Sequence, residues 1–306
     1  MSKLTTLIVM FLALAGGAAI GTASDHGGER PAPYMRMGFG GRQTAMGGAG
    51  TALTGGLASG FWNPANLTGV RTFQFYTQYS FLTMDRTLAY LSLGNRLERS
   101  PLSYSISWAY FSAGDELEFR YGPSYDPVYN FSDSEMAFFI TTAYRISSRV
   151  SVGTNVKVHT HWLGEFFGWG MGEDAGVLVR VSRETKLGLS IQDPLSAVKF
   201  QNTDSGGIPM ALKTGVSHTF FDPYLTVSGD LVYSADLGLE PAGGIEWMPG
   251  YGIGLRAGWG TKSFRCGFGI IARGSRLVEE FNYTLIQDTL QEGSVLHRVS
   301  VGMRFR

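Results

Sequence analysis

Two histidines in the segment Val150–Trp162 have the residue type and spacing that could hold a metal ion. His159 and His161 are two residues apart, and in a β-strand such residues share one face, so both imidazoles could coordinate one ion. The spacing fixes no third ligand, and Lys157 lies on the same face, where its charge disfavours a cation. We therefore interpret Lys157, His159 and His161, with Arg180 from the next segment, as polar residues that line a lumen, and expect neither a metal nor a cofactor.

One stretch matches a nucleotide-binding motif by its letters alone. Gly252, Gly254 and Ala257 have the spacing of a dinucleotide fingerprint, which requires a strand, a tight turn and a helix. Here apolar residues alternate without interruption from Tyr251 to Trp259, which indicates a strand. The sequence has no Gly-x-Ser-x-Gly elbow, no phosphate-binding loop with lysine and no carboxylates paired at a defined site. These observations point away from an enzyme.

The charge balance argues against nucleic acid as a partner. The chain has 25 basic and 25 acidic residues, so its formal net charge is zero, and it has no run of five or more basic residues. A nucleic-acid-binding domain ordinarily carries a basic patch or stripe. The single cysteine, Cys266, excludes an internal disulfide and a cysteine-rich metal site.

The elements that must position the polar residues are strands. From residue 72 onward, large apolar residues alternate with small or polar ones in segments of about ten residues, and turn residues separate the segments. The pattern predicts about fourteen strands, an even number that suits a closed antiparallel barrel. The predicted strands are Phe73–Phe81, Leu88–Leu93, Ser103–Tyr110, Met136–Ile146, Val150–Trp162, Asp174–Val181, Leu187–Ile191, Leu212–Phe220, Leu225–Tyr233, Gly243–Trp247, Tyr251–Trp259, Phe264–Ala272, Leu277–Leu285 and Val295–Phe305.

Composition favours a barrel in a membrane over a soluble one. Only 16% of the residues are charged, against about 25% in a typical soluble domain. A barrel of this strand number encloses a lumen too wide for side chains to fill, and closure satisfies every backbone hydrogen bond within lipid. We therefore predict an all-β fold, a closed antiparallel transmembrane β-barrel whose outer face contacts outer-membrane lipid. A soluble all-β domain is the alternative.

The two ends of the chain support a Gram-negative-type outer membrane as the location. Residues 1–23 have a positive start, an apolar run and small residues before Ser24, which is the pattern of a cleaved secretory signal peptide. An uncleaved anchor is the rival interpretation. The alternating strand that closes on Phe305 resembles the terminal strand of bacterial outer-membrane proteins.

The region between the signal peptide and the first strand has a different character. Residues 24–70 are rich in Gly, Ala and Thr and lack strand alternation, so we predict a compact plug, or hatch, inside a barrel formed by residues 71–306. Its Gly-Arg-x-x-Ala-Met-Gly-Gly-Ala run and its Trp-Asn-Pro-Ala motif resemble the PorV/PorQ family, which belongs with the FadL-like outer-membrane barrels. The matching hatch residues are Arg42, Met46, Gly47, Gly48, Trp62, Asn63, Pro64 and Ala65.

The resemblance implies two roles. FadL-like members pass hydrophobic small molecules across the outer membrane, with the hatch gating the lumen, and this is the first hypothesis. PorV-like members bind protein cargo for the type IX secretion system and hand it over, which would make secretion-system proteins or cargo the partners. A structural barrel without a ligand is the third hypothesis.

Two further sets of residues carry expectations. For a transport barrel we predict an apolar ligand pocket beneath the long loops, lined partly by Trp162, Phe166, Phe167 and Trp169. Inward charged residues of both signs are expected to pair across the lumen or hold the plug, with Arg42 pairing with one of the acids. That inward set is Arg145, Arg180, Asp230, Glu246, Arg256, Arg265, Glu280, Arg298 and Arg304.

Overall fold

The computed structural model describes residues 32–114, 117–120, 127–200, 206–260, 262–291 and 293–306. The predicted signal peptide, residues 1–23, lies outside the described residues, as does the first part of the predicted hatch, residues 24–31. Among the residues that the structure describes, no helix is long and apolar enough to cross a bilayer.

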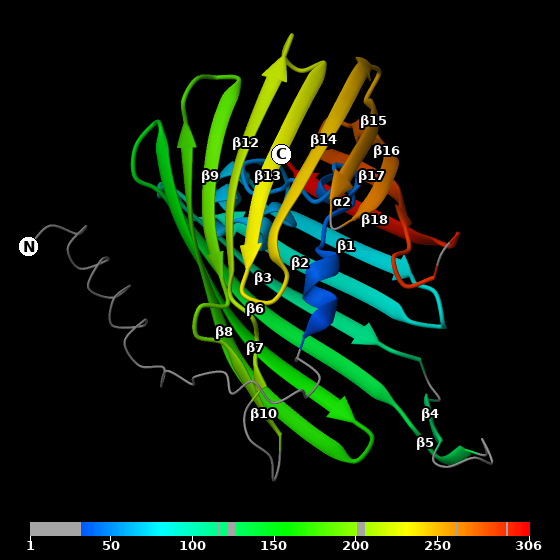
Figure 1. The fold of residues 1–306 in the computed structure, drawn as a ribbon. Helices are drawn as coiled ribbons and strands as arrows, with labels where there is room; N and C mark the ends of the chain where they lie inside the picture. Colours follow the sequence, from blue (N-terminus) through cyan, green and yellow to red (C-terminus); the bar gives the residue numbers. More distant parts are fainter. Residues whose placement is uncertain (1–31, 115–116, 121–126, 201–205, 261, 292) are drawn as a thin grey trace, which may run out of the picture.

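The chain forms a closed antiparallel barrel of fourteen strands, which confirms the predicted fold class (Figure 1). Each barrel strand pairs with the next one along the chain, and the last strand closes the barrel by pairing with the first. The barrel strands are β1 (Gln74–Phe81), β2 (Thr87–Arg96), β3 (Leu102–Ser112), β6 (Asp133–Arg145), β7 (Val150–Leu163), β8 (Phe166–Arg180), β9 (Thr185–Gln192), β12 (Ala211–Phe220), β13 (Leu225–Ser234), β14 (Gly238–Gly250), β15 (Ile253–Gly260), β16 (Ser263–Arg273), β17 (Leu277–Gln287) and β18 (Val295–Phe305).

The two ends of the barrel differ in the length of their connections. The segments after β3 and after β9, residues 113–132 and 193–210, emerge at one end, which we call the loop end. They contain the hairpin of β4 (Leu117–Arg120) with β5 (Pro127–Phe131), and the short strands β10 (Ala197–Phe200) and β11 (Gly206–Gly207). The other end, which we call the turn end, carries short connections and lies at the top of Figure 1.

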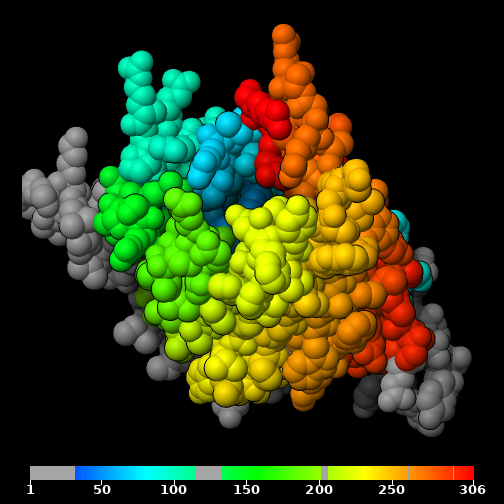
Figure 2. Space-filling model, turned by 90° about the horizontal axis from the view of Figure 1, so that it is seen from above, coloured from blue at the N-terminus to red at the C-terminus, as the bar shows by residue number. Residues whose placement is uncertain are grey.

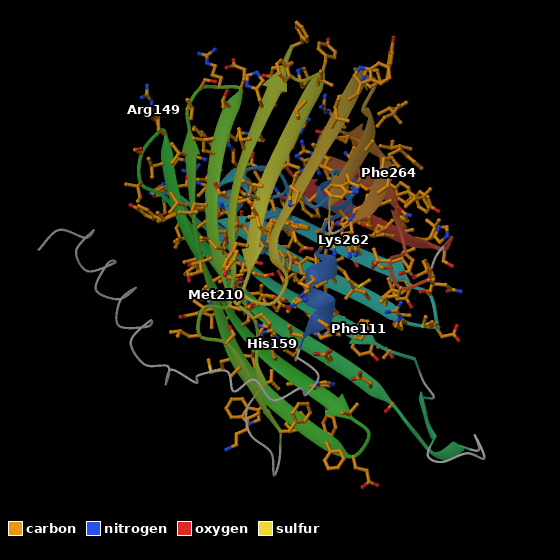
Figure 3. All side chains as sticks on the ribbon, viewed as in Figure 1. Phe111, Arg149, His159, Met210, Lys262 and Phe264 are labelled. Carbon is orange, nitrogen blue, oxygen red and sulfur yellow. The ribbon has the colours of Figure 1, made fainter. Side chains whose placement is uncertain are left out.

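Side chains alternate between a buried inner face and an exposed outer face. Inward Ser105 and Thr141 are 2% and 3% exposed, whereas their outward neighbours Ile106 and Ile140 are 60% and 58% exposed. Figure 3 shows side chains projecting outward all round the ribbon. An apolar outer face would be unfavourable in water, so this alternation is what a lipid-facing barrel requires.

Residues 32–70 form an inner segment that runs inside the barrel from the loop end to the turn end (Figure 1, blue). It contains the short helices η1 (Pro33–Met37), α2 (Gly41–Ala45), α3 (Ser59–Trp62) and η2 (Pro64–Gly69). Helix α2 packs against β15, β16, β17 and β18, while η2 packs against β3, β6, β7 and β8 on the opposite wall. The role of this segment as a hatch remains a prediction.

The apolar core lies between the inner segment and one side of the wall. Phe39 stacks on Tyr90 with ring centroids 4.5 Å apart, and it meets Phe61 edge-on at 4.7 Å. Tyr34 stacks on Phe111 at 5.5 Å. Such aromatic pairs add about 0.5–1.5 kcal/mol each beyond the burial of their area. This cluster fixes the inner segment against β2, β3 and β6.

Several strands are longer than predicted, most of all β14, for which Gly243–Trp247 was predicted, and β8. β8 begins at Phe166 rather than near Asp174. Its first half places Gly168, Gly170 and Gly172 on the inner face, where they leave no inward side chain to mark the alternation. A Cβ on Gly170 would overlap the carbonyl of Ala197 in β10, so the glycines allow β10 to approach.

Candidate functional site

Glycines on the wall allow the predicted hatch motif to dock directly on the strands. The segment Asn63-Pro64 packs on β7 and β8, where a Cβ on Gly153 would lie 2.5 Å from the backbone of Pro64. A Cβ on Gly176 would overlap the amide oxygen of Asn63. Real Cβ atoms do not approach this closely, so a side chain at either glycine would push the inner segment away from the wall. Part of the high glycine content therefore reflects this contact.

Asn63 is the centre of the hydrogen bonds that hold this part of the inner segment. Its side chain is fully buried, and Nδ2 donates to the carbonyls of Thr51 and Val177 at 2.9 and 3.0 Å. Its Oδ1 accepts from the backbone N–H of Ala65 at 3.0 Å, which caps η2. One amide therefore joins two parts of the inner segment to strand β8.

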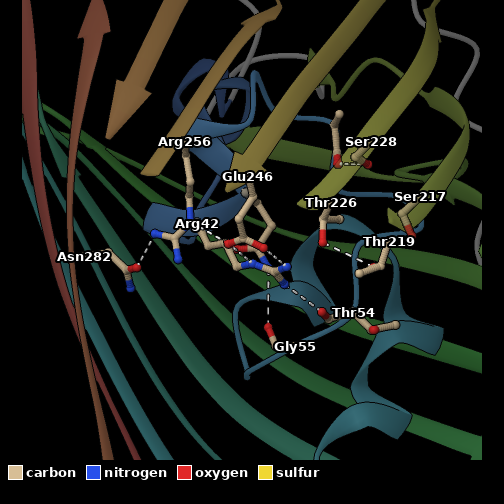
Figure 4. A network of polar contacts seen from close by, with 12 residues as sticks. Arg42, Thr54, Gly55, Ser217, Thr219, Thr226, Ser228, Glu246, Arg256 and Asn282 are labelled. Atoms are coloured by element: carbon tan, nitrogen blue, oxygen red, sulfur yellow. Dashed lines mark hydrogen bonds and ion pairs between the residues drawn. The ribbon is translucent and has the colours of Figure 1, made fainter. Parts of the chain in front are cut away.

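On the opposite wall, Arg42 anchors α2 through a buried network (Figure 4). Its Nε and Nη2 donate to the two carboxylate oxygens of Glu246 at 2.8 and 2.5 Å, and its Nη1 donates to the carbonyl of Thr54 at 2.9 Å. Arg256 donates from Nε to the same carboxylate at 2.7 Å and from Nη1 to Asn282. Burial opposes the charge of Arg42, but Glu246 outweighs burial, so the pKa of Arg42 lies above its ordinary value. The predicted pairing of Arg42 with an inward acid is confirmed.

Other inward charges also hold the inner segment, as predicted. Asp230 accepts from the backbone N–H of Thr51 at 2.8 Å. Arg298, which is fully buried, donates to the carbonyl of Gly38 at 2.9 Å and to the hydroxyl of Thr44 at 2.5 Å. On the inner face of the wall, Arg304 of β18 pairs with Glu280 of the neighbouring strand β17 at 3.2 Å. Five members of the predicted inward set form no ion pair with a described residue. Asp230 and Arg298 bond neutral groups instead, and the other three are Arg145, Arg180 and Arg265.

The predicted lumen residues of β7 do face inward, and they form a charged cluster with the connection that follows β9. The ammonium of Lys157 lies 2.7 Å from Asp174 and 2.5 Å from Asp193. His161 contacts Asp133 through Nε2 at 2.7 Å, whereas His159 is buried and neither of its ring nitrogens has a hydrogen-bond partner among the described residues.

The structure brings no third metal ligand to this pair of histidines among the residues that it describes. Within the part of the chain that the structure describes, no group of three or more His, Cys, Asp or Glu residues could hold an ion. The Lys157 cluster instead fixes the first residue of the connection after β9 to the wall.

The wall is interrupted where this connection begins. β8 pairs with β9 through residues 174–180 and with β10 through residues 168–171, so β10 continues the line of β9 after the irregular residues 193–196. On its other side β9 pairs with β12, whereas β10 pairs with β11. Among the described strands, no pairing joins the hairpin of β10 and β11 to β12. The hydrogen-bonded wall therefore has a break near the loop end.

A cavity of about 370 Å³ lies behind this break. It is bounded by the inner segment on one side and by β9, β12, β13, β14 and β16 on the other. Residues on both sides of the break line it, including Gln192 of β9 and Ile208 and Pro209 of the connection. The larger apolar side chains of the lining are Met35, Trp62, Ile208, Val232 and Leu237.

Two cations without a carboxylate partner give the cavity a polar side. Lys213 and Arg265 are 8% and 5% exposed, and neither forms an ion pair with a described residue. The ammonium of Lys213 lies 5.3 Å from the ring centroid of Trp62. The guanidinium of Arg265 donates from Nε to Ser263 at 3.2 Å. The acids on the lining are Asp193, which Lys157 already neutralises, and Glu240.

The aromatic residues predicted for a ligand pocket lie elsewhere. Trp162 and Trp169 point to the outer face of β7 and β8, where they are 47% and 56% exposed. Trp162 packs on Phe167 with ring centroids 4.5 Å apart, and Phe166 is also exposed at the loop end. None of the four lines the cavity behind the break. Trp162, Phe167 and Trp169 lie on the outside of the barrel near the loop end, whereas Phe166 is the first residue of β8 and has the strand parity of inward Gly168.

Four of the hatch-motif residues lie beside the cavity or beneath it. Trp62, Gly47 and Gly48 line the cavity, and the indole N–H of Trp62 donates to the carbonyl of Phe39 at 2.6 Å. Met46 and Gly47 press on the wall, where a Cβ on Gly244 or Gly258 would overlap their backbone. The motif therefore shapes the cavity floor as well as fixing the inner segment.

Comparison with known proteins shows which solved structures share this fold. No protein-family model matches the chain, and no curated protein matches it. Among solved structures, the Pseudomonas putida toluene transporter TodX is 13% identical with a TM-score of 0.65, the match covering 88% of this chain and 97% of TodX. The Ralstonia pickettii toluene transporter TbuX is 17% identical with a TM-score of 0.58, over 89% of this chain and 100% of TbuX.

A third similar structure is a Pseudomonas aeruginosa FadL homologue. It is 10% identical with a TM-score of 0.58, and the match covers 87% of this chain and 96% of the homologue. The chain has a FadL-like fold. In this FadL-like barrel the docked inner segment, the break in the wall and the cavity behind it lie close together, and they are the features from which function can be argued.

Proposed function

We propose that this FadL-like barrel lies in an outer membrane and binds and passes hydrophobic small molecules. The exposed apolar outer face supports a lipid environment, and the fold is shared with barrels described as toluene transporters. The observation that carries the proposal is the cavity behind the break in the wall. Its volume of about 370 Å³ falls within the range of small-molecule pockets, about 300–1,000 Å³.

The lining indicates the chemistry of the ligand. One side is apolar and holds the indole of Trp62, while the other carries Lys213 and Arg265 without a carboxylate partner. A buried cation is stabilised when an anion joins it, and an acidic group on the ligand would supply that anion. The ligand class that fits best is therefore a hydrophobic molecule with an acidic group.

The route through the barrel would involve both the break and the inner segment. The break leaves a short stretch of wall without strand pairing beside the cavity, so a ligand could enter there from the loop end or from the outer face. Passage toward the turn end requires the inner segment to shift, because it packs on both walls. This is the hatch role that the Asn-Pro-Ala motif implies.

The alternative role, binding protein cargo for a secretion system, predicts a closed lumen without a small-molecule pocket. The cavity favours the transport proposal over that alternative and over a structural barrel without a ligand. Protein cargo would have to dock on the loop-end connections, residues 113–132 and 193–210, parts of which lie outside the described residues.

Calorimetric titration of the purified full chain in detergent tests the proposal, with the heat of empty micelles subtracted. Decanoate should bind to the wild type, and Lys213→Met should weaken its binding by about tenfold or more, because a hydrogen bond to a charged group contributes about 1.5–3 kcal/mol. Lys199→Met is the matched control, since this lysine is exposed on β10 and does not line the cavity. Binding of neither decanoate nor toluene would contradict the proposal.

A further inference from the structure

A second hollow lies at the opposite end of the barrel and has a different chemistry. It has a volume of about 640 Å³ and opens at the turn end, with inner-segment residues at its floor (Figure 2). Thr54, Gly55 and Gly69 line it from the inner segment. Most of the other lining residues are basic and come from three connections and two strands, and Figure 3 marks one of them, Arg149, at this end. Together with nearby Arg145 of β6, we call this set the basic mouth: Arg71, Arg145, Arg149, Arg180, Arg183 and Lys186.

The strand register forces like charges together in the basic mouth. Arg180 of β8 stands directly opposite Lys186 of β9 at the last pair of the ladder. Both are on the inward face, since they continue the inward series of Asp174 on β8 and Ser190 on β9. Like charges at directly opposed positions destabilise a sheet. Arg145 adds to the repulsion, because it lies near Arg180 and Arg71.

No carboxylate in the described chain relieves this repulsion through an ion pair with the basic mouth. Glu184 is exposed and accepts a hydrogen bond from Ser182 instead. The contacts that the cations do make are to neutral groups of the inner segment. Arg145 donates from Nη2 to the carbonyl of Thr68 at 2.8 Å, and its Nε is buried without a partner among the described residues.

Lys186 makes the second contact of this kind, donating to the hydroxyl of Thr54 at 2.9 Å. The inner segment therefore holds Arg145 and Lys186 in place through neutral groups. Two acids lie near the basic mouth, Asp222 near Lys186 and Glu184 beside Arg183, but neither forms an ion pair with it. Guanidinium groups present paired N–H donors that match the oxygens of carboxylates and phosphates. A bound oxyanion would therefore stabilise several such cations that surround one hollow.

We propose that the basic mouth is an oxyanion-binding site at the turn end of the barrel. It shares no lining residue with the cavity behind the break, so it does not depend on the proposed transport function. The oxyanion has two sources that share one chemistry. It is either the acidic group of a hydrophobic molecule that leaves the barrel, or a free phosphate or phosphate ester on the turn-end side of the membrane.

Titration calorimetry with inorganic phosphate at low salt tests the site on the purified full chain. Phosphate should bind to the wild type, and the double variant Arg180→Gln with Lys186→Gln should weaken binding by about tenfold or more, because each charge-assisted bond contributes about 1.5–3 kcal/mol. The matched control is Arg273→Gln with Arg276→Gln, which removes two cations from the same end but outside the hollow. The variants remove like charges, so the folded barrel should be retained.

A second arm separates the two sources. Decanoate is titrated into the cavity variant Lys213→Met with Arg265→Gln, in which the cavity has lost its two cations without an ion pair and the basic mouth keeps all of its cations. Binding of decanoate there, lost when Arg180→Gln and Lys186→Gln are added, supports the acidic group of a transported molecule. Binding of phosphate alone supports a free phosphate. The proposal is overturned if neither probe binds, or if the control at Arg273 and Arg276 weakens binding as much as the test variant.

Discussion

The carboxylate of Glu246 should decide whether α2 stays on the wall. In Glu246→Gln, the shape is kept but the charge that faces Arg42 and Arg256 is lost. The carboxylate accepts three charge-assisted hydrogen bonds of 2.5–2.8 Å, and the side chains of Glu246 and Arg256 are 4% and 1% exposed. Removing one partner of a buried ion pair costs about 3–5 kcal/mol.

We expect the low end of that range for this variant. Glutamine keeps one acceptor oxygen, and Arg42 keeps its hydrogen bond to the carbonyl of Thr54 at 2.9 Å. A cost of about 3 kcal/mol corresponds to about a hundredfold change in an equilibrium constant. Because most of the wall contacts of α2 are on the side of β15–β18, the cost should appear as local opening of the inner segment rather than unfolding of the barrel.

Hydrogen exchange followed by mass spectrometry measures this opening directly. Backbone amides of residues 41–50 should exchange about a hundredfold faster in Glu246→Gln than in the wild type, while the strands stay protected. Glu280→Gln is the control, because Glu280 pairs at 3.2 Å with Arg304, whose side chain is 38% exposed, and an exposed pair contributes below about 1 kcal/mol. Unchanged exchange of residues 41–50 in Glu246→Gln would refute the anchoring role of this network.

Three further variants test the docking of the inner segment and the break in the wall. Asn63→Ala should lower the free energy of unfolding by about 2–3 kcal/mol in a denaturant titration, since it leaves buried carbonyls and an N–H unpaired; a loss below about 0.5 kcal/mol would contradict this. Gly176→Ala should displace the inner segment and raise its protease sensitivity, whereas Gly229→Ala, where a Cβ meets only a carbonyl at 3.9 Å, should not. Lys157→Met leaves Asp193 and its partner carboxylate unpaired, so amides of residues 193–196 should exchange at least about tenfold faster; equal rates would show that the cluster does not hold the break.

The strands and the polarity of the lumen could be predicted from the sequence because a period of two is a local signal. Ser105, Ile106, Ile140 and Thr141 take the faces that alternation assigns to them. The pairing of Arg42 with an inward acid was also predictable in kind, since a buried charge needs a partner. Which acid it meets depends on the stagger of β14 against α2, and no local pattern encodes that.

The cavity could not be predicted from the sequence. Trp62, Lys213 and Arg265 come from the inner segment, β12 and β16, and they converge only after the barrel has closed. The predicted pocket included Trp162, although this residue belongs to the predicted strand Val150–Trp162. The alternation held a contrary signal, because an inward His161 requires an outward Trp162 on the same strand.

The break after β9 could not be predicted from the sequence either. The predicted strands Leu187–Ile191 and Leu212–Phe220 leave residues 193–209 as a loop, but β10 within that stretch returns to β8. The first half of β8 pairs with it through a face of glycines, which give no apolar alternation to read. Sequence patterns therefore predict the strands of the barrel well, but they give little indication of the place where its wall is interrupted.

The most direct test of the central claim is mass spectrometry of the molecules that co-purify with the full-length barrel after detergent exchange. The account predicts a hydrophobic acid bound to the wild type and to Lys199→Met, and its depletion from the variant Lys213→Met with Arg265→Gln. A barrel that carries no hydrophobic molecule, or one that carries the same molecule in equal amount after both cavity cations are removed, would contradict the account.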